Sequence, residues 1–126
     1  MSSDIALTVP ARSEFVSVLR AVTASVAARL AWPYDAVDDL RLAVDEACAQ
    51  LLSLPASELT LTISATEDAL DVVVATDADP GGWPPPGAEG SLAWRVVSAL
   101  TDEAGFDRSD GGPVVRMKKR VGGPGS

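Results

Sequence analysis

The chain has 126 residues, of which 47% are hydrophobic, so it is long enough for one domain with a real core and unlike an intrinsically disordered chain. The formal net charge is −8, and no apolar run approaches the ~20 residues that span a bilayer. Histidine is absent, which excludes histidine-based general base catalysis and histidine ligation of a metal. The first ten residues lack the basic and apolar regions of a signal peptide, so we expect a cytoplasmic protein with no membrane partner.

Charge is distributed unevenly along the chain. Four of the ten basic residues lie near the C-terminus: Arg116, Lys118, Lys119 and Arg120. The first 115 residues therefore hold six basic against 18 acidic residues, a net charge of −12. Such a body repels nucleic acid and suits a partner with a basic surface. The basic run could contact phosphate, but a charged outer strand is the favoured interpretation, and we expect no direct nucleic-acid partner.

The first elements are predicted from their periodicity. Residues 4–9 (DIALTV) alternate apolar and polar side chains as a strand does, and Pro10 ends them. Residues 11–30 are predicted to form a helix, whose apolar stripe is Phe15, Leu19, Val22, Val26 and Leu30. The Trp-Pro-Tyr sequence at residues 32–34 separates this helix from the next.

The longest predicted helix covers residues 35–54 (DAVDDLRLAVDEACAQLLSL), with Asp35 as its N-cap. One apolar stripe runs along it, formed by Val37, Leu40, Val44, Ala47, Cys48 and Leu51. Cys48 is the only cysteine and is expected to be a packed thiol. Glu46 and Gln50 are four residues apart and lie on one side, well off the apolar stripe. They are candidates for lining a pocket; the alternative is a solvated face.

The second half of the chain begins with a predicted antiparallel hairpin, residues 58–66 and 70–76, with a short turn at residues 67–68. Residues 77–90 hold four prolines and four glycines and are predicted to form a loop. A helix is predicted over residues 91–103, capped by Ser91. Its inner face is predicted to be Leu92, Val96, Ala99 and Leu100.

Two short segments complete the predicted fold: a turn or strand at residues 105–110 and a last strand at residues 113–121. We expect one domain over residues 1–121, followed by a flexible tail at 122–126. The predicted fold is an α+β two-layer sandwich, in which a mostly antiparallel mixed sheet carries helices on one face. Trp83 and Trp94 could fold the loop onto the core or present a sticky surface, and packing in the core is favoured.

Four stretches together resemble a known family: DDLRLAVDEACAQLL, VVVATDADPGG, GSLAWRVVSALTDEAGF and GGPVVRMKKRV. Their order along the chain is similar to that of the small anti-sigma factors of the RsbW and SpoIIAB type. Those proteins share the Bergerat ATP-binding fold of histidine kinases and gyrase. The sequence around the first and third stretches resembles most the actinobacterial branch that acts on sigma factors of the sigma-F type.

This resemblance implies a function and a set of partners. Members of the family dimerise and clamp an alternative sigma factor, keeping it from RNA polymerase. They also use Mg-ATP to phosphorylate a serine of an anti-anti-sigma protein of STAS fold. The resemblance therefore implies ATP and Mg²⁺ as cofactors, with a sigma factor, a STAS protein and a second copy of the chain as partners.

The family's functional residues are matched in part. The resemblance makes Glu46 the general base that activates the attacking hydroxyl, a role open to a carboxylate. It makes Asp77 the partner of the adenine amino group and Gly81 the second glycine of the first glycine-rich loop. It also makes Arg20 an arginine that contacts both protein clients; an ordinary solubilising arginine is the alternative.

The other motif positions depart from the family pattern. Gln50 stands where the family has its Mg-binding asparagine, and its extra methylene displaces the amide oxygen from the tight Mg²⁺ shell. Asp79 replaces the first glycine of the loop, and Ser91 and Ala93 replace the two glycines of the second box, where added Cβ atoms hinder a phosphate cradle. Two threonines of the final strand are replaced by Pro113 and Val114. Only nine residues separate Gly81 from Ser91, which makes the ATP lid short, and the prolines at 84–86 stiffen it.

These departures leave three hypotheses. The first is an anti-sigma factor that sequesters a sigma factor by surface complementarity and has a degenerate ATP site. The second is an active serine protein kinase of the same family. The third is a non-enzymatic α+β interaction domain outside the family, which uses its proline-rich loop as the contact.

Overall fold

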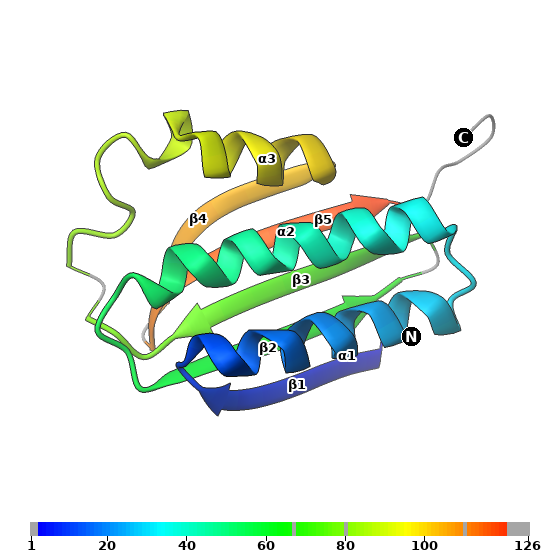
Figure 1. The fold of residues 1–126 in the computed structure, drawn as a ribbon, viewed down its shortest axis with the longest axis horizontal. Helices are drawn as coiled ribbons and strands as arrows, with labels where there is room; N and C mark the ends of the chain where they lie inside the picture. The colour runs from blue at the N-terminus through cyan, green and yellow to red at the C-terminus, as the bar shows by residue number, and fades with distance from the viewer. Residues whose placement is uncertain (1–2, 67, 80, 110, 121–126) are drawn as a thin grey trace.

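The computed structural model describes residues 3–66, 68–79, 81–109 and 111–120. It has five strands and three α-helices in two layers (Figure 1). The strands are β1 (Ser3–Pro10), β2 (Glu58–Ala65), β3 (Ala69–Thr76), β4 (Glu103–Ser109) and β5 (Gly112–Arg120). The helices are α1 (Val16–Arg29), α2 (Tyr34–Leu52) and α3 (Leu92–Leu100), with short 3-10 turns η1 (Ser13–Phe15) and η2 (Ala88–Gly90). This confirms the predicted order of elements and the α+β class.

The sheet has the strand order β1-β2-β3-β5-β4, and all three α-helices cover one of its faces (Figure 1). All four strand pairings are antiparallel, so the predicted mixed sheet is wrong in that detail. The hairpin of β2 and β3 is confirmed, with Ile63 opposite Val72. The last strand is not an outer strand as predicted, because β5 lies between β3 and β4.

Side chains alternate across the sheet as the strand pattern requires. The residues of β2 and β3 that point toward the helices are buried: Leu59, Leu61, Ile63, Leu70, Val72 and Val74. Helix α2 covers them with its own buried stripe, Leu40, Ala43, Val44, Ala47, Cys48 and Leu51. The core therefore lies between α2 and the centre of the sheet, which makes α2 the framework of the domain.

Helix boundaries differ from the predictions, including the end of α2 at Leu52 instead of residue 54. Helix α2 begins at Tyr34, and Pro33 occupies its N-cap without a side-chain hydrogen bond, so Asp35 lies in the first turn and is not the cap. Because Pro has a fixed φ, it suits the start of a helix without a polar cap. Residues 11–15 form an irregular entry and the turn η1 before α1 begins at Val16. Helix α3 ends at Leu100, since the chain is extended again by Glu103.

The inner face of α3 also differs from the prediction, except at Leu100, which is partly buried and packs against the core. Trp94 and Val97 are its buried residues, whereas Leu92 and Val96 are 77% and 37% exposed. The reason is an aromatic contact, because Trp94 stacks on Phe106 of β4 with ring centroids 4.0 Å apart. A large planar partner on the sheet turns the helix toward the tryptophan, and the smaller aliphatic stripe is left outside.

Candidate functional site

Helix α2 presents Glu46 and Gln50 on the side away from its buried stripe, and both side chains are partly exposed. The helix packs beside α3 (Figure 1). The ion pairs of α2 within the described residues engage Asp38, Asp39 and Asp45 and leave Glu46 out. The Glu46 carboxylate is therefore open to solvent and to a ligand, as a general base must be.

Asp77 follows β3, and its side chain points toward the beginning of β2. Its Oδ1 accepts hydrogen bonds from the backbone N–H groups of Ser57 and Glu58, at 2.8 and 3.0 Å. These bonds, the one from Glu58 first, hold the pKa of Asp77 below its ordinary value of 3.8. The carboxylate that the resemblance assigns to adenine thus joins the end of β3 to the backbone at the start of β2.

The loop after Asp77 binds its own carboxylate. Oδ1 of Asp79 accepts a hydrogen bond of 2.9 Å from the backbone N–H of Gly81. That N–H is the kind of donor that a glycine-rich loop offers to phosphate. Asp79 both occupies the donor and adds a negative charge where a phosphate would approach.

Trp83 anchors the same loop in the core. Its side chain is 1% exposed, and its Nε1 donates a 3.0 Å hydrogen bond to the backbone carbonyl of Asp107 on β4. Its ring meets Phe106 edge to face, with centroids 5.3 Å apart. Phe106 is the centre of the cluster, because Trp94 stacks on its ring as well. The prediction that both tryptophans pack in the core is confirmed; Phe106 was missed, although alternation along residues 103–109 places it on the buried side.

The second glycine-rich box has become an ordinary helix cap. Ser91 is the N-cap of α3: its Oγ accepts from the N–H of Trp94 at 3.1 Å and donates to the carbonyl of Ala88 at 2.7 Å. This confirms the predicted cap. Ala93 is partly buried in the first turn. Because Ser91 takes a backbone donor at the helix N-terminus, that donor is not available for an anion.

The positions that would hold Mg-ATP therefore fit it poorly. In three places a polar group of the expected site already has a partner within the chain: Asp77, the Gly81 N–H and the Trp94 N–H. Within the described residues, no group of three or more His, Cys, Asp or Glu side chains could hold a metal ion. Gln50 would have to supply the metal ligand, with the reach of its longer side chain.

Arg20 lies on a different surface, where α1 packs against α2. Its guanidinium is 3.5 Å from the Asp45 carboxylate, and the two side chains are 38% and 41% exposed. Cys48 lies beneath them and is fully buried, which confirms the packed thiol. Burial raises the pKa of Cys48 to about 12; the charge of Asp45 adds to the rise, and that of Arg20 opposes it. An exposed, weakly held ion pair can exchange its partner for one on another protein.

The C-terminal basic residues are paired with carboxylates of this chain. Arg116 contacts Asp107 and Arg120 contacts Glu103, each at 2.7 Å, and longer pairs join Lys118 to Asp71 and Lys119 to Asp39. The hydrogen bond from Arg116 lowers the pKa of Asp107. These charges fasten β5 to its neighbours, so the basic run has a structural role.

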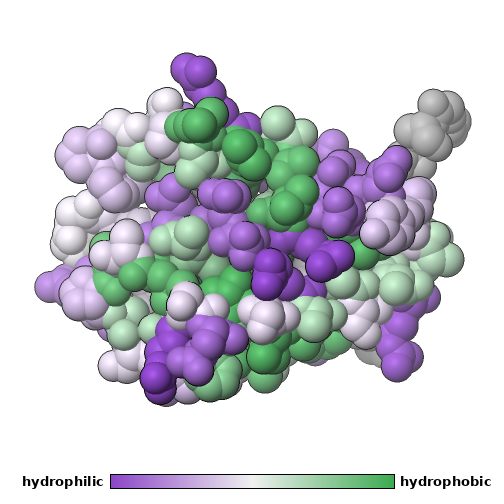
Figure 2. Space-filling view, viewed as in Figure 1, coloured by the Kyte–Doolittle hydropathy of each residue, from purple (hydrophilic) through white to green (hydrophobic). Residues whose placement is uncertain are grey.

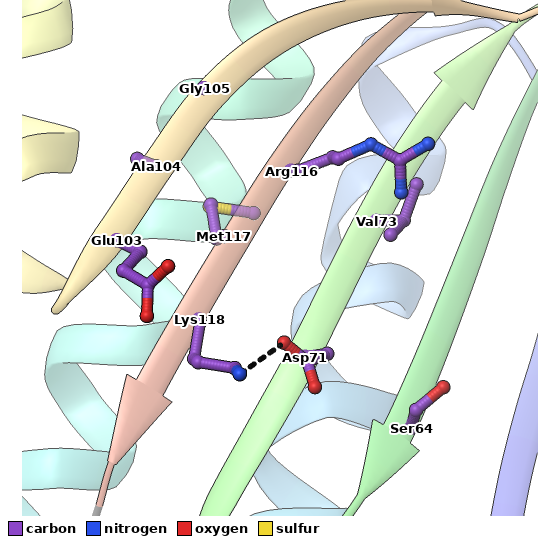
Figure 3. Close-up of a pocket in the computed structure, with 9 residues that line it drawn as sticks. All are labelled: Ser64, Asp71, Val73, Glu103, Ala104, Gly105, Arg116, Met117 and Lys118. Carbon is purple, nitrogen blue, oxygen red and sulfur yellow. Dashed lines mark ion pairs between the residues drawn. The ribbon is translucent and has the colours of Figure 1, made fainter.

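A shallow cavity of about 480 Å³ lies on the sheet face that the helices leave open (Figure 3). Gly105 leaves space between the charged side chains of β3, β4 and β5 there, and the Lys118–Asp71 pair crosses it. None of the positions that the resemblance assigns to the nucleotide lines this cavity. It is a gap in a charged sheet surface, separate from α2 and α3.

Comparison with known proteins agrees with the fold and the motif order. Residues 9–119 match the family model of the histidine kinase-like ATPase domain. The chain is 29% identical to the serine-protein kinase RsbW of Bacillus subtilis (strain 168), over 94% of this chain and 86% of that protein. It is 35% identical to the anti-sigma-F factor RsbW of Mycobacterium tuberculosis (strain ATCC 25618 / H37Rv), over 79% of this chain and 58% of that protein.

A crystal structure of the RsbU and RsbW domains of Rv1364c from Mycobacterium tuberculosis has the same fold. It superposes with a TM-score of 0.73 over 97% of this chain and 33% of that one, at 15% sequence identity.

The chain belongs to the family of histidine kinase-like ATPase domains. Within that family, its curated relatives include proteins named RsbW, one of them mycobacterial, as the sequence motifs predicted. The hypothesis of an interaction domain outside the family is therefore wrong. None of the helices in the described ranges combines the length and apolar character needed to cross a bilayer.

Proposed function

We propose that this chain is an anti-sigma factor that binds and sequesters an alternative sigma factor, and that its nucleotide site no longer works. The observation that carries the second part is the closed loop. Asp79 holds the Gly81 N–H, Ser91 caps α3, and Trp83 fixes the segment between them in the core. A nucleotide would have to displace these contacts before it could make its own.

The sigma-binding part rests on the relatives and on two features of the surface. One relative is named an anti-sigma-F factor, and the body of the chain is strongly acidic, which complements a basic, DNA-facing protein. Arg20 lies partly exposed between α1 and α2, in a pair that a client carboxylate can replace. Sequestering a sigma factor from RNA polymerase requires that the protein act in the cytoplasm.

The second candidate function is that of an active serine protein kinase that phosphorylates a STAS protein. Several relatives are named serine-protein kinases, and the Glu46 carboxylate is left out of the ion pairs of α2. This candidate requires that Gln50 hold Mg²⁺ and that the Trp83 side chain leave the core, so that the loop can open. A STAS client is expected only in this case or through passive binding to the Arg20 surface.

We also propose a homodimer. Strand β1 is an edge of the sheet, and Ile5 on it and Val18 on α1 are each 40% exposed. An edge strand with unpaired backbone and apolar neighbours is a natural surface for a second copy. Analytical ultracentrifugation of wild type and Ile5→Asp tests it: a monomeric wild type contradicts the dimer.

The main test measures the binding of nucleotide and the binding of sigma factor in one series of titrations. Calorimetric titration with Mg-ADP is expected to give no binding heat, and the sigma factor is expected to bind equally with and without Mg-ATP. A clear heat that Asp77→Asn abolishes favours the kinase. Arg20→Ala should weaken the sigma complex about tenfold, as loss of an interface arginine often does.

A useful control restores the motif. Gln50→Asn, Asp79→Gly and Ser91→Gly together return three family residues but leave Trp83 in place. If the anchored loop blocks the site, this variant still binds no Mg-ADP, and adding Trp83→Ser is needed for any heat. If the triple variant binds nucleotide by itself, residue identity and not loop closure was the obstacle.

A further inference from the structure

Helix α3 has apolar residues on two sides. Trp94 and Val97 are buried against the sheet, while Leu92 and Val96 point to solvent, with Ala99 exposed further along the same side. We call Leu92, Val96 and Ala99 the α3 stripe. Their spacing of four and three places them on one line of the helix. A continuous apolar line contributes nothing to this core and is typical of an interaction surface.

Helix α2 runs beside this stripe and is acidic. It holds five acidic residues and one basic residue: Asp35, Asp38, Asp39, Asp45 and Glu46, and Arg41. Figure 2 shows hydrophobic surface over α3 next to a largely hydrophilic band along α2. Asp38, Asp39 and Asp45 pair with Arg41, Lys119 and Arg20, so Asp35 and Glu46 are the α2 carboxylates outside the ion pairs of the described residues and the ones offered to whatever covers the α3 stripe.

We propose that the α3 stripe and the acidic side of α2 form a docking surface for a basic amphipathic helix of the sigma factor, a surface separate from Arg20. The inference rests on the proposed function and adds the place and the chemistry of a contact. The apolar face of such a helix covers Leu92 and Val96, and its Lys and Arg residues face the carboxylates of α2.

Charge decides between this occupant and others. A second copy of the chain, nucleic acid and an anionic membrane would each bring negative charge against α2, which repels them. A basic protein helix brings the opposite charge and an apolar face. Helix α3 is also held rigidly for such a contact, through the Ser91 cap and the stacking of Trp94 on Phe106.

The test uses purified sigma factors and the full-length chain. Each alternative sigma factor of the organism that encodes the chain is titrated against wild type and against Leu92→Ser/Val96→Ser. Both residues are exposed, so the double variant should keep its fold, which urea unfolding checks. We expect it to bind at least about tenfold more weakly. Tyr34→Ser is the matched control, because Tyr34 is 78% and Leu92 77% exposed; it should bind within about twofold.

A charge pair tests the chemistry of the occupant. Leu92→Lys should weaken the complex more than Leu92→Glu, because lysine repels a basic helix and glutamate attracts it. A double variant that binds like wild type, or an equal loss for lysine and glutamate, overturns the docking surface and leaves the proposed function standing. A wild-type chain that binds no sigma factor overturns the proposed function itself, and with it the occupant named here.

Discussion

Helix α2 and the segment at residues 77–91 carry the residues that the sequence resemblance assigns to a nucleotide, and they are held by different interactions. Helix α2 is fixed by its apolar stripe, which leaves the polar Glu46 on the other side unengaged. The loop has no periodic stripe and is fixed by single contacts, of which Trp83 is the largest. Regular packing on one side of α2 leaves polar side chains on its other side available, whereas the loop uses its own polar groups to hold its backbone.

Although the loop and α2 are held by different interactions, we expect the loop to be attached as firmly as the helix. Trp83→Ala and Leu40→Ala remove fully buried side chains from the two regions. We expect losses in the free energy of unfolding of about 3–5 and about 2–5 kcal/mol, from lost burial and the remaining cavity. Urea unfolding measures both, with exposed Tyr34→Ala as the control. A loss below about 1 kcal/mol for Trp83→Ala would mean that the loop is not anchored by this side chain.

The buried thiol on α2 predicts a loss of stability at alkaline pH. The pKa of Cys48 is about 12 in the folded chain and 9.0 without burial, so the unfolded chain loses this proton first. The contribution is complete below pH 9.0 and is lost as the pH rises toward 12. We expect the difference in melting temperature between wild type and Cys48→Ala to shift against wild type over this range. An unchanged difference would contradict the burial of the thiol.

The loop predicts the opposite dependence. The pKa of Asp77 is lowered from 3.8 in the folded chain, so its contribution is present above that value and is lost as the pH falls below it. Asp77→Asn keeps an acceptor oxygen but not the charge. Wild type should melt above this variant at about pH 7, and the difference should narrow as the pH falls below 3.8. If the difference persists in acid, the bonds to Ser57 and Glu58 do not depend on the charge.

The smallest effect is expected at Glu46. Its partly exposed side chain lies outside the ion pairs of α2, so Glu46→Gln should change the free energy of unfolding by no more than about 0.5 kcal/mol. Phosphate transfer to a STAS protein that disappears in Glu46→Gln would show instead that this carboxylate still works as a base.

Much of the fold follows from local patterns. Alternation gave the β2–β3 hairpin, and the helical stripe gave α2 with its buried Cys48, because each pattern depends only on neighbours along the chain. The inner face of α3 was predicted wrongly except at Leu100. The aliphatic residues Leu92 and Val96 have the right spacing, and only the position of Phe106 on β4 selects Trp94 instead.

The candidate site was predictable in its residue types but not in its hydrogen bonds. The sequence motifs name Asp77, Gly81 and Ser91 as positions of interest, and the replacement of glycine by Asp79 warns of repulsion. That Asp77 turns to the start of β2 depends on strand register, which brings together residues about twenty positions apart. Register is a property of the whole sheet, so local sequence does not contain it.

The sequence by itself determined the family, the two-layer architecture and the acidic character, because these depend on periodicity, motif order and composition. The tertiary structure decided which polar groups remain available. Packing brought Trp83 against β4, turned Asp77 toward the start of β2 and left the α3 stripe outside. The physical reason is that hydrogen bonds and aromatic contacts between distant segments form only once the core has set their geometry.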